Sequence, residues 1–194
     1  MGALDMSSRW RFARLVTTVL AGLALLQAAP AAAQSSGVEF AVSGTSTIRG
    51  WTCSVSGSAE VTPGASAPVP GFDTGIQTAT LTVPVNGFDC PEEEMREHLL
   101  EALQADEFDE ITFRLESYAV SGPQAQATGS LTILDATAPV TFPISLSASG
   151  TGVEIEGELR LDMTTYGVEP PVVMLGLLRV RPQIRIEFSG LITP

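Results

Sequence analysis

The chain has a single histidine, His98, and this limits the chemistry that its side chains can perform. Any Ser-His-Asp or Cys-His arrangement would have to use this one imidazole as its base. His98 lies beside Glu94, Glu97 and Glu101, where a solvated or half-buried helix residue is the simpler interpretation. We therefore assign no catalytic residue and expect that the protein is not an enzyme.

Carboxylates are concentrated in two runs, "EEE" at 92–94 and "ADEFDE" at 105–110. A calcium loop of the EF-hand type needs oxygen ligands at alternate positions around a central glycine, and the second run lacks both features. The chain also has no C-x-x-C pair, no glycine-rich phosphate loop before a helix, and no basic patch with aromatics. We expect no metal and no cofactor.

The charge balance excludes one class of partner. The formal net charge is −12, and all ten basic residues are arginines. Nucleic-acid binding needs clustered cations against phosphate, so we expect no nucleic-acid partner. The same acidity disfavours docking on anionic lipid headgroups.

The N-terminus has the layout of a secretory signal peptide. Three arginines precede an apolar run at 15–26, and an Ala-x-Ala site follows at 31–33. Twelve apolar residues span only about 18 Å as a helix, short of the roughly 30 Å of a bilayer core, which disfavours a membrane anchor. We predict a cleaved signal peptide at 1–33, one mature domain at 34–194, and a periplasmic or secreted location.

Two cysteines remain, Cys53 and Cys90. An even count in an exported protein favours a disulfide, although two buried free thiols fit the sequence as well. A closed loop of about 38 residues would stabilise the fold by roughly 4 kcal/mol in the chain-entropy model.

From residue 38 onward, most of the chain alternates apolar and polar residues with period 2 and has short connections. This pattern predicts about eight antiparallel strands, each with one apolar face. In 111–120, for example, the alternation places Phe113, Leu115 and Ala119 on the apolar face. Both a closed barrel and a two-sheet sandwich fit. A membrane-spanning barrel is disfavoured because opposite faces carry charged residues, such as Glu154 and Arg160.

The segment 90–113 departs from this pattern and predicts one short amphipathic helix. Pro91 suits a first helical turn, and the glutamates at 92–94 suit the positive end of the helix dipole. Apolar residues at helical spacing form one stripe: Met95, Leu99, Ala102 and Leu103.

Four segments occur in the order expected of a known family. They are "GTSTIRGWTCSVSG", "MREHLLEALQADEFDEITFRL", "GSLTILDATAPVTFPISL" and "MTTYGVEPPVVMLGLLRVRPQIRIEF". Over about residues 38–190, the chain resembles the YceI-like family of lipocalin-like, polyisoprenoid-binding exported proteins. The resemblance implies an all-β fold, an eight-stranded antiparallel barrel with one short helix near its mouth.

The resemblance also implies that the barrel interior holds a long isoprenoid or similar amphiphile. We expect the helix to cover one end of this barrel with Met95, Leu99 and Leu103 inward. If Cys53 and Cys90 pair, which the resemblance does not itself imply, the disulfide would fix the start of the helix to the second strand. Trp51, Tyr118 and Tyr166 would offer polar tips at the mouth. The candidate ligand-binding residues are Phe113, Leu115, Leu131, Ile133, Phe142, Ile144, Leu146, Ile155, Leu159, Ile186 and Phe188. The alternative is a non-catalytic structural or interaction module of the cell envelope with a filled core. A homodimer is compatible with either.

Overall fold

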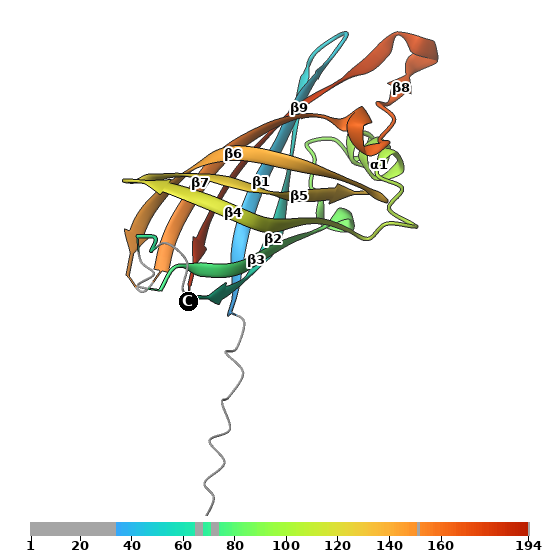
Figure 1. The fold of residues 1–194 in the computed structure, drawn as a ribbon. Helices are drawn as coiled ribbons and strands as arrows, with labels where there is room; N and C mark the ends of the chain where they lie inside the picture. The colour runs from blue at the N-terminus through green and yellow to red at the C-terminus, as the bar shows by residue number, and fades with distance from the viewer. Residues whose placement is uncertain (1–33, 65–67, 71–73, 151, 194) are drawn as a thin grey trace, which may run out of the picture. The chain divides into compact units, whose positions relative to one another are not determined.

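The computed structural model describes residues 34–64, 68–70, 74–150 and 152–193 (Figure 1). The predicted signal peptide at 1–33 lies outside the described residues. The strands are β1 (Gln34–Ser46), β2 (Gly50–Pro63), β3 (Ile76–Pro84), β4 (Glu110–Ser121), β5 (Gln124–Ile133), β6 (Ala136–Ser149), β7 (Gly152–Asp162), β8 (Val172–Val173) and β9 (Leu178–Ile192). The helices are η1 (Val85–Gly87), α1 (Glu93–Ala102), η2 (Met163–Tyr166) and η3 (Met174–Gly176).

Eight of the strands form a closed antiparallel barrel. The sheet runs in the order β1-β2-β3-β4-β5-β6-β7-β9, and β1 also pairs with β9. Phe40 lies opposite Phe188 in this closing ladder. The eight-stranded barrel is therefore confirmed and the sandwich is excluded. The ninth strand, β8, is a two-residue addition that pairs only with β9.

The alternation of the sequence separates the two faces of the wall. Along β1, Val38, Phe40 and Val42 point inward and are at most 9% exposed. On the outer face, threonines of neighbouring strands meet, as in the 3.0 Å hydrogen bond between the Thr128 and Thr141 hydroxyls. Because β1 and β9 close the ladder, neither strand is left as an open edge.

A β-bulge in β4 changes which residues face inward. The register shifts between Leu115 and Ser117, so one extra residue enters this strand. Beyond the bulge, Tyr118 and Val120 pack on the core while Ala119 is exposed. The prediction that Ala119 lies on the apolar face is therefore wrong, since alternation alone does not reveal a bulge.

The predicted helix is confirmed as α1, with one correction at its start. Glu92 is the N-cap, so Pro91 precedes the helix instead of lying in its first turn. Glu93 and Glu94 occupy that first turn, as expected from the helix dipole. Met95, Leu99 and Leu103 pack against the main core, so the apolar stripe faces the barrel as predicted.

Candidate ligand-binding lumen

The interior of the barrel contains an apolar cavity of about 190 Å³. Side chains from β1 to β7 and from β9 line it, and none of them is charged. It contains ten of the eleven predicted residues: Phe113, Leu115, Leu131, Phe142, Ile144, Leu146, Ile155, Leu159, Ile186 and Phe188. We call this space the lumen.

A second cavity, of about 280 Å³, lies between the barrel and α1, and we call it the mouth cavity. It contains the eleventh predicted residue, Ile133, together with Met95 and Leu99 of α1. Unlike the lumen, it is bordered by polar and charged side chains, namely Ser46, Arg49, Glu92, Glu94 and His98. Five residues line both spaces, so the two adjoin: Val42, Phe88, Ile111, Leu131 and Ile186.

Four inward-facing glycines let aromatic rings lie close against the wall. At each of them, a Cβ atom would come within about 3 Å of an aromatic side chain on an adjacent strand. The pairs are Gly44 with Trp51, Gly57 with Phe40, Gly129 with Phe113, and Gly157 with Phe188. Rings that lie over glycines occupy the space of the missing side chains and leave the centre of the barrel open.

Three of these aromatic rings meet in one cluster with Phe142. The ring of Phe142 lies 5.4 Å from that of Phe113 and 5.6 Å from that of Phe188, between centroids. Phe40 lies 6.1 Å from Phe188. Tilted and edge-to-face contacts at these distances are favourable, so the cluster holds the rings in place around the lumen.

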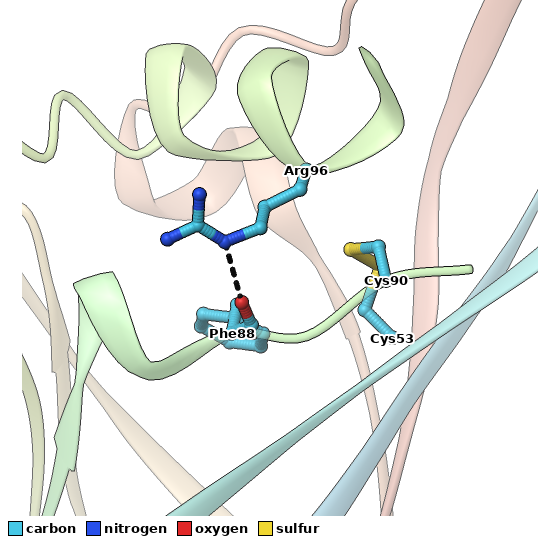
Figure 2. Close-up of a disulfide and its surroundings, with 4 residues drawn as sticks. All are labelled: Cys53, Phe88, Cys90 and Arg96. Atoms are coloured by element: carbon cyan, nitrogen blue, oxygen red, sulfur yellow. Dashed lines mark hydrogen bonds between the residues drawn. A yellow bond between two sulfur atoms is a disulfide. The ribbon is translucent and has the colours of Figure 1, made fainter. Parts of the chain in front are cut away.

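The segment before α1 is joined covalently to the barrel. Cys53 of β2 and Cys90 form a disulfide, which settles the question that the sequence left open (Figure 2). Beside it, Ser54 and Asp89 exchange two backbone hydrogen bonds of 2.8 Å. These contacts fix the start of the cap to the second strand, as expected.

Arg96 ties the helix itself to this segment. Figure 2 shows its side chain reaching from α1 to Phe88, whose carbonyl oxygen accepts a 3.0 Å hydrogen bond from Nε. A second nitrogen of Arg96 donates to the carbonyl of Asn86 at 3.3 Å. At the helix start, Arg49 forms an ion pair with Glu92 and also donates a hydrogen bond to its carboxylate. This hydrogen bond lowers the pKa of the Glu92 carboxyl. Both partners are about half exposed, so the pair orients the helix more than it stabilises the fold.

The three polar tips predicted at the mouth lie in different places. Trp51 does line the mouth cavity, and its buried Nε1 has no hydrogen-bond partner within the described part of the chain. The Tyr118 hydroxyl accepts a 2.9 Å hydrogen bond from the backbone N–H of Ile76 and lies at the lumen instead. Tyr166 is only 2% exposed and packs in the core below the mouth, where burial raises its pKa.

Several lining residues were not identified as ligand candidates from the sequence. Val38, Phe40 and Val55 of the first two strands line the lumen, and the same alternation could have indicated them. Met163 and Val168 line the mouth cavity from an irregular segment that has no periodicity to reveal them. His98 is half-buried at the mouth. No three His, Cys, Asp or Glu residues lie close enough to hold a metal ion among the residues described.

Asp162 positions the irregular segment below the mouth, and this gives a testable pH dependence. Its carboxylate accepts hydrogen bonds from the hydroxyl and backbone N–H of Thr164, which lower its pKa from the ordinary 3.8. A lowered pKa in the folded state adds stability above pH 3.8, which is lost as the pH falls through the lowered value. We expect Tm between pH 5 and 3 to fall more steeply for the wild type than for Asp162→Asn, by roughly a few degrees at most. Equal slopes would contradict this role.

A closed eight-stranded barrel with an apolar lumen and a helical cap belongs to the class of β-barrels whose interior can hold one small ligand. The model of the YceI-like domain matches residues 29–190, so the chain belongs to the YceI-like family. The chain matches no curated protein. No helix in the described ranges is long and apolar enough to cross a membrane.

Solved structures with the same fold share little sequence with this chain. BcnA from Burkholderia cenocepacia has a TM-score of 0.64 and 20% identity, covering 79% of this chain and 96% of its own. A polyisoprenoid binding domain from Saccharophagus degradans has a TM-score of 0.64 and 11% identity, covering 84% and 100%. The Campylobacter jejuni YCEI protein has a TM-score of 0.52 and 12% identity, covering 70% and 82%. At these identities the likeness establishes the fold alone.

Proposed function

We propose that this protein is exported and binds a long isoprenoid or similar amphiphile in its lumen, without catalysis. The observation that carries the proposal is the lumen itself, a space inside the barrel lined almost entirely by aliphatic and aromatic side chains, with no charge among them. A related domain is described as polyisoprenoid-binding, which supports the same class of ligand.

The dimensions of the two cavities favour a long, narrow ligand. Neither 190 nor 280 Å³ alone reaches the roughly 300 Å³ at which small-molecule sites usually begin. Because five lining residues are common to both, a single chain that passes from one to the other would use the space of each. Burial of each CH₂ is worth about 0.8 kcal/mol, so such a ligand binds well without a specific polar contact in the lumen.

The distribution of polar side chains favours one orientation of this ligand. Of the two cavities, only the mouth cavity is bordered by charged side chains, among them Arg49 and Glu94, and the polar His98 lies there too. A polar headgroup in the lumen would lose its hydration with no charged or amide partner there, at a cost of roughly 2 kcal/mol or more. The apolar tail therefore occupies the lumen and the headgroup lies under α1.

The remaining features fit a carrier or scavenger outside the inner membrane. The predicted signal peptide at 1–33 directs export to the periplasm or beyond. A disulfide between Cys53 and Cys90 suits an oxidising compartment. His98 lies at the mouth among carboxylates and has no nucleophile assigned to it, so we infer binding without turnover.

Extraction of the purified protein with organic solvent, followed by mass spectrometry, tests the proposal. We expect a long-chain amphiphile in near-stoichiometric amount, or its uptake when delipidated protein is incubated with isoprenoid alcohols. No extracted lipid together with no uptake would favour the alternative, an envelope module whose core needs no ligand.

A further inference from the structure

Five large apolar side chains gather at the mouth end of the barrel without cover. Ile48 lies in the turn between β1 and β2, and the others lie in β8 and around η3. We call them the apolar rim: Ile48, Val172, Met174, Leu175 and Leu177, which are 63%, 56%, 63%, 107% and 74% exposed. In the described part of the chain, the one other exposed large apolar residue is Leu191, near the end of β9.

Hydrogen bonds join the two loops of the rim into one surface. The hydroxyl of Thr47 donates to the carbonyl of Leu177 at 2.8 Å, and the N–H of Arg179 donates to that hydroxyl at 3.2 Å. The N–H of Thr47 donates to the carbonyl of Arg179 at 3.0 Å. Segments about 130 residues apart therefore expose their apolar side chains together, at the end of the barrel where α1 lies (Figure 1).

The backbone at the tip of the rim adopts a conformation that leucine and methionine rarely take. Met174 and Leu175 have φ of 52° and 54°, in the left-handed region, and Gly176 follows at 89°. Asn or Gly would satisfy this backbone with less strain. A fully exposed leucine at such a position gains nothing from the barrel core, so its apolar side chain is better explained by an external contact.

The segment that carries most of the rim has a net charge opposite in sign to that of the protein. From Met163 to Arg181 the chain has two arginines and one carboxylate, whereas the whole chain has a net charge of −12. Arg179 and Arg181 are exposed, and neither forms an ion pair with a carboxylate in the described ranges. Charges are screened over about 8 Å at physiological ionic strength, so these two cations act mainly on groups that the rim itself contacts.

We propose that the apolar rim docks on the surface of an anionic lipid bilayer. Leu175 and Leu177 enter the acyl boundary, and Arg179 and Arg181 lie against lipid phosphates, as in interfacial anchors that combine the two contacts. The net acidity disfavours docking on anionic headgroups for the molecule as a whole, whereas the rim segment itself is basic. A two-fold contact between copies is less favourable, since it would place the arginines of both copies together.

Docking in this way places the mouth cavity next to the membrane. Val173, Met174 and Leu178 line this cavity from the same segment that carries the rim. The proposal does not require a ligand in the lumen, because it depends only on the exposure of the rim side chains.

Vesicle cosedimentation tests the proposal with protein that begins at Gln34, which contains the eight strands of the barrel and also β8. We expect binding to phosphatidylcholine vesicles that contain phosphatidylglycerol, and weaker binding to phosphatidylcholine alone. Leu175→Asn combined with Leu177→Ser should lower the partition coefficient about tenfold or more, because two leucine contacts are lost. Arg181→Gln should lower it about fivefold, on the anionic vesicles only.

Two matched variants control for general effects of these changes. Leu191→Ser removes an exposed leucine outside the rim, and Arg114→Gln removes an exposed arginine from the outer face of β4; both should bind vesicles like the wild type. All variants should have a Tm no lower than that of the wild type and should keep lumen uptake in vesicle-free buffer. If the protein binds vesicles but takes up no ligand, that result would contradict the proposed function of the lumen and would leave the proposal for the rim intact.

Three results would overturn the proposal. The first is no binding of the wild type to anionic vesicles, and the second is binding that neither rim variant changes. The third is a dimer in solution that the Leu175→Asn, Leu177→Ser variant converts to a monomer, with no vesicle binding, because the rim would then be an interface between copies.

Discussion

Replacement of both Cys53 and Cys90 by alanine should lower the free energy of unfolding by about 4 kcal/mol. The two residues are 37 positions apart, so their bond closes a long loop in the unfolded chain and reduces its entropy. The loop contains most of β2 and all of β3, together with the segment that leads into α1. Loss of the buried Cys53 sulfur adds a smaller packing cost.

Urea unfolding with and without a thiol reductant measures this contribution. The reductant should lower the midpoint of the wild type and leave the double-alanine variant unchanged. A Cys90→Ala variant largely separates the bond from packing, because it loses the crosslink and the half-buried Cys90 sulfur but keeps the buried Cys53 side chain. A wild-type midpoint that does not move after complete reduction would contradict the assigned role.

Substitution of Gly157 by alanine should weaken uptake into the lumen about tenfold and destabilise the barrel by roughly 1–3 kcal/mol. Its new Cβ would lie 2.3 Å from Cζ of Phe188, which is an impossible contact. The Phe188 ring then has to swing away from the wall, toward Phe142 and the open centre of the barrel. A displaced ring would occupy much of a space of only about 190 Å³.

Displacement of an apolar fluorophore by isoprenoid alcohols measures the effect on uptake. Gly37→Ala is the matched control, since this glycine of β1 has no atom within 4 Å of an added Cβ and should bind normally. Phe188→Leu, introduced into the Gly157→Ala protein, should restore part of the uptake by removing the displaced ring. Normal uptake by Gly157→Ala would show that the ring position does not control the lumen.

The sequence predicted the strands well because burial on one face requires alternation. Val38, Phe40 and Val42 needed only their spacing to be placed inward. Closure of the barrel could not be predicted in this way, since the ladder that pairs Phe40 with Phe188 joins residues far apart in the chain. Periodicity describes one strand at a time, and a sandwich would show the same pattern.

The candidate site was predicted in its apolar lining but not in its detailed form. The bulge after Leu115 reversed the orientation of Ala119, because one inserted residue shifts every later side chain to the other face. The glycine beneath Phe188 is informative only once the neighbouring strand is known. The rim around Leu175 lies in a segment without periodicity, where tertiary hydrogen bonds such as that from Thr47 determine the backbone.

A high-resolution crystal structure of the protein, purified from its source without a delipidation step, tests the central claim most directly. We predict continuous density for one elongated molecule, with its tail beside Phe142 and Phe188 and its polar end under Met95 and His98. A lumen closed by collapsed side chains, or one that contains only ordered water, would contradict the account.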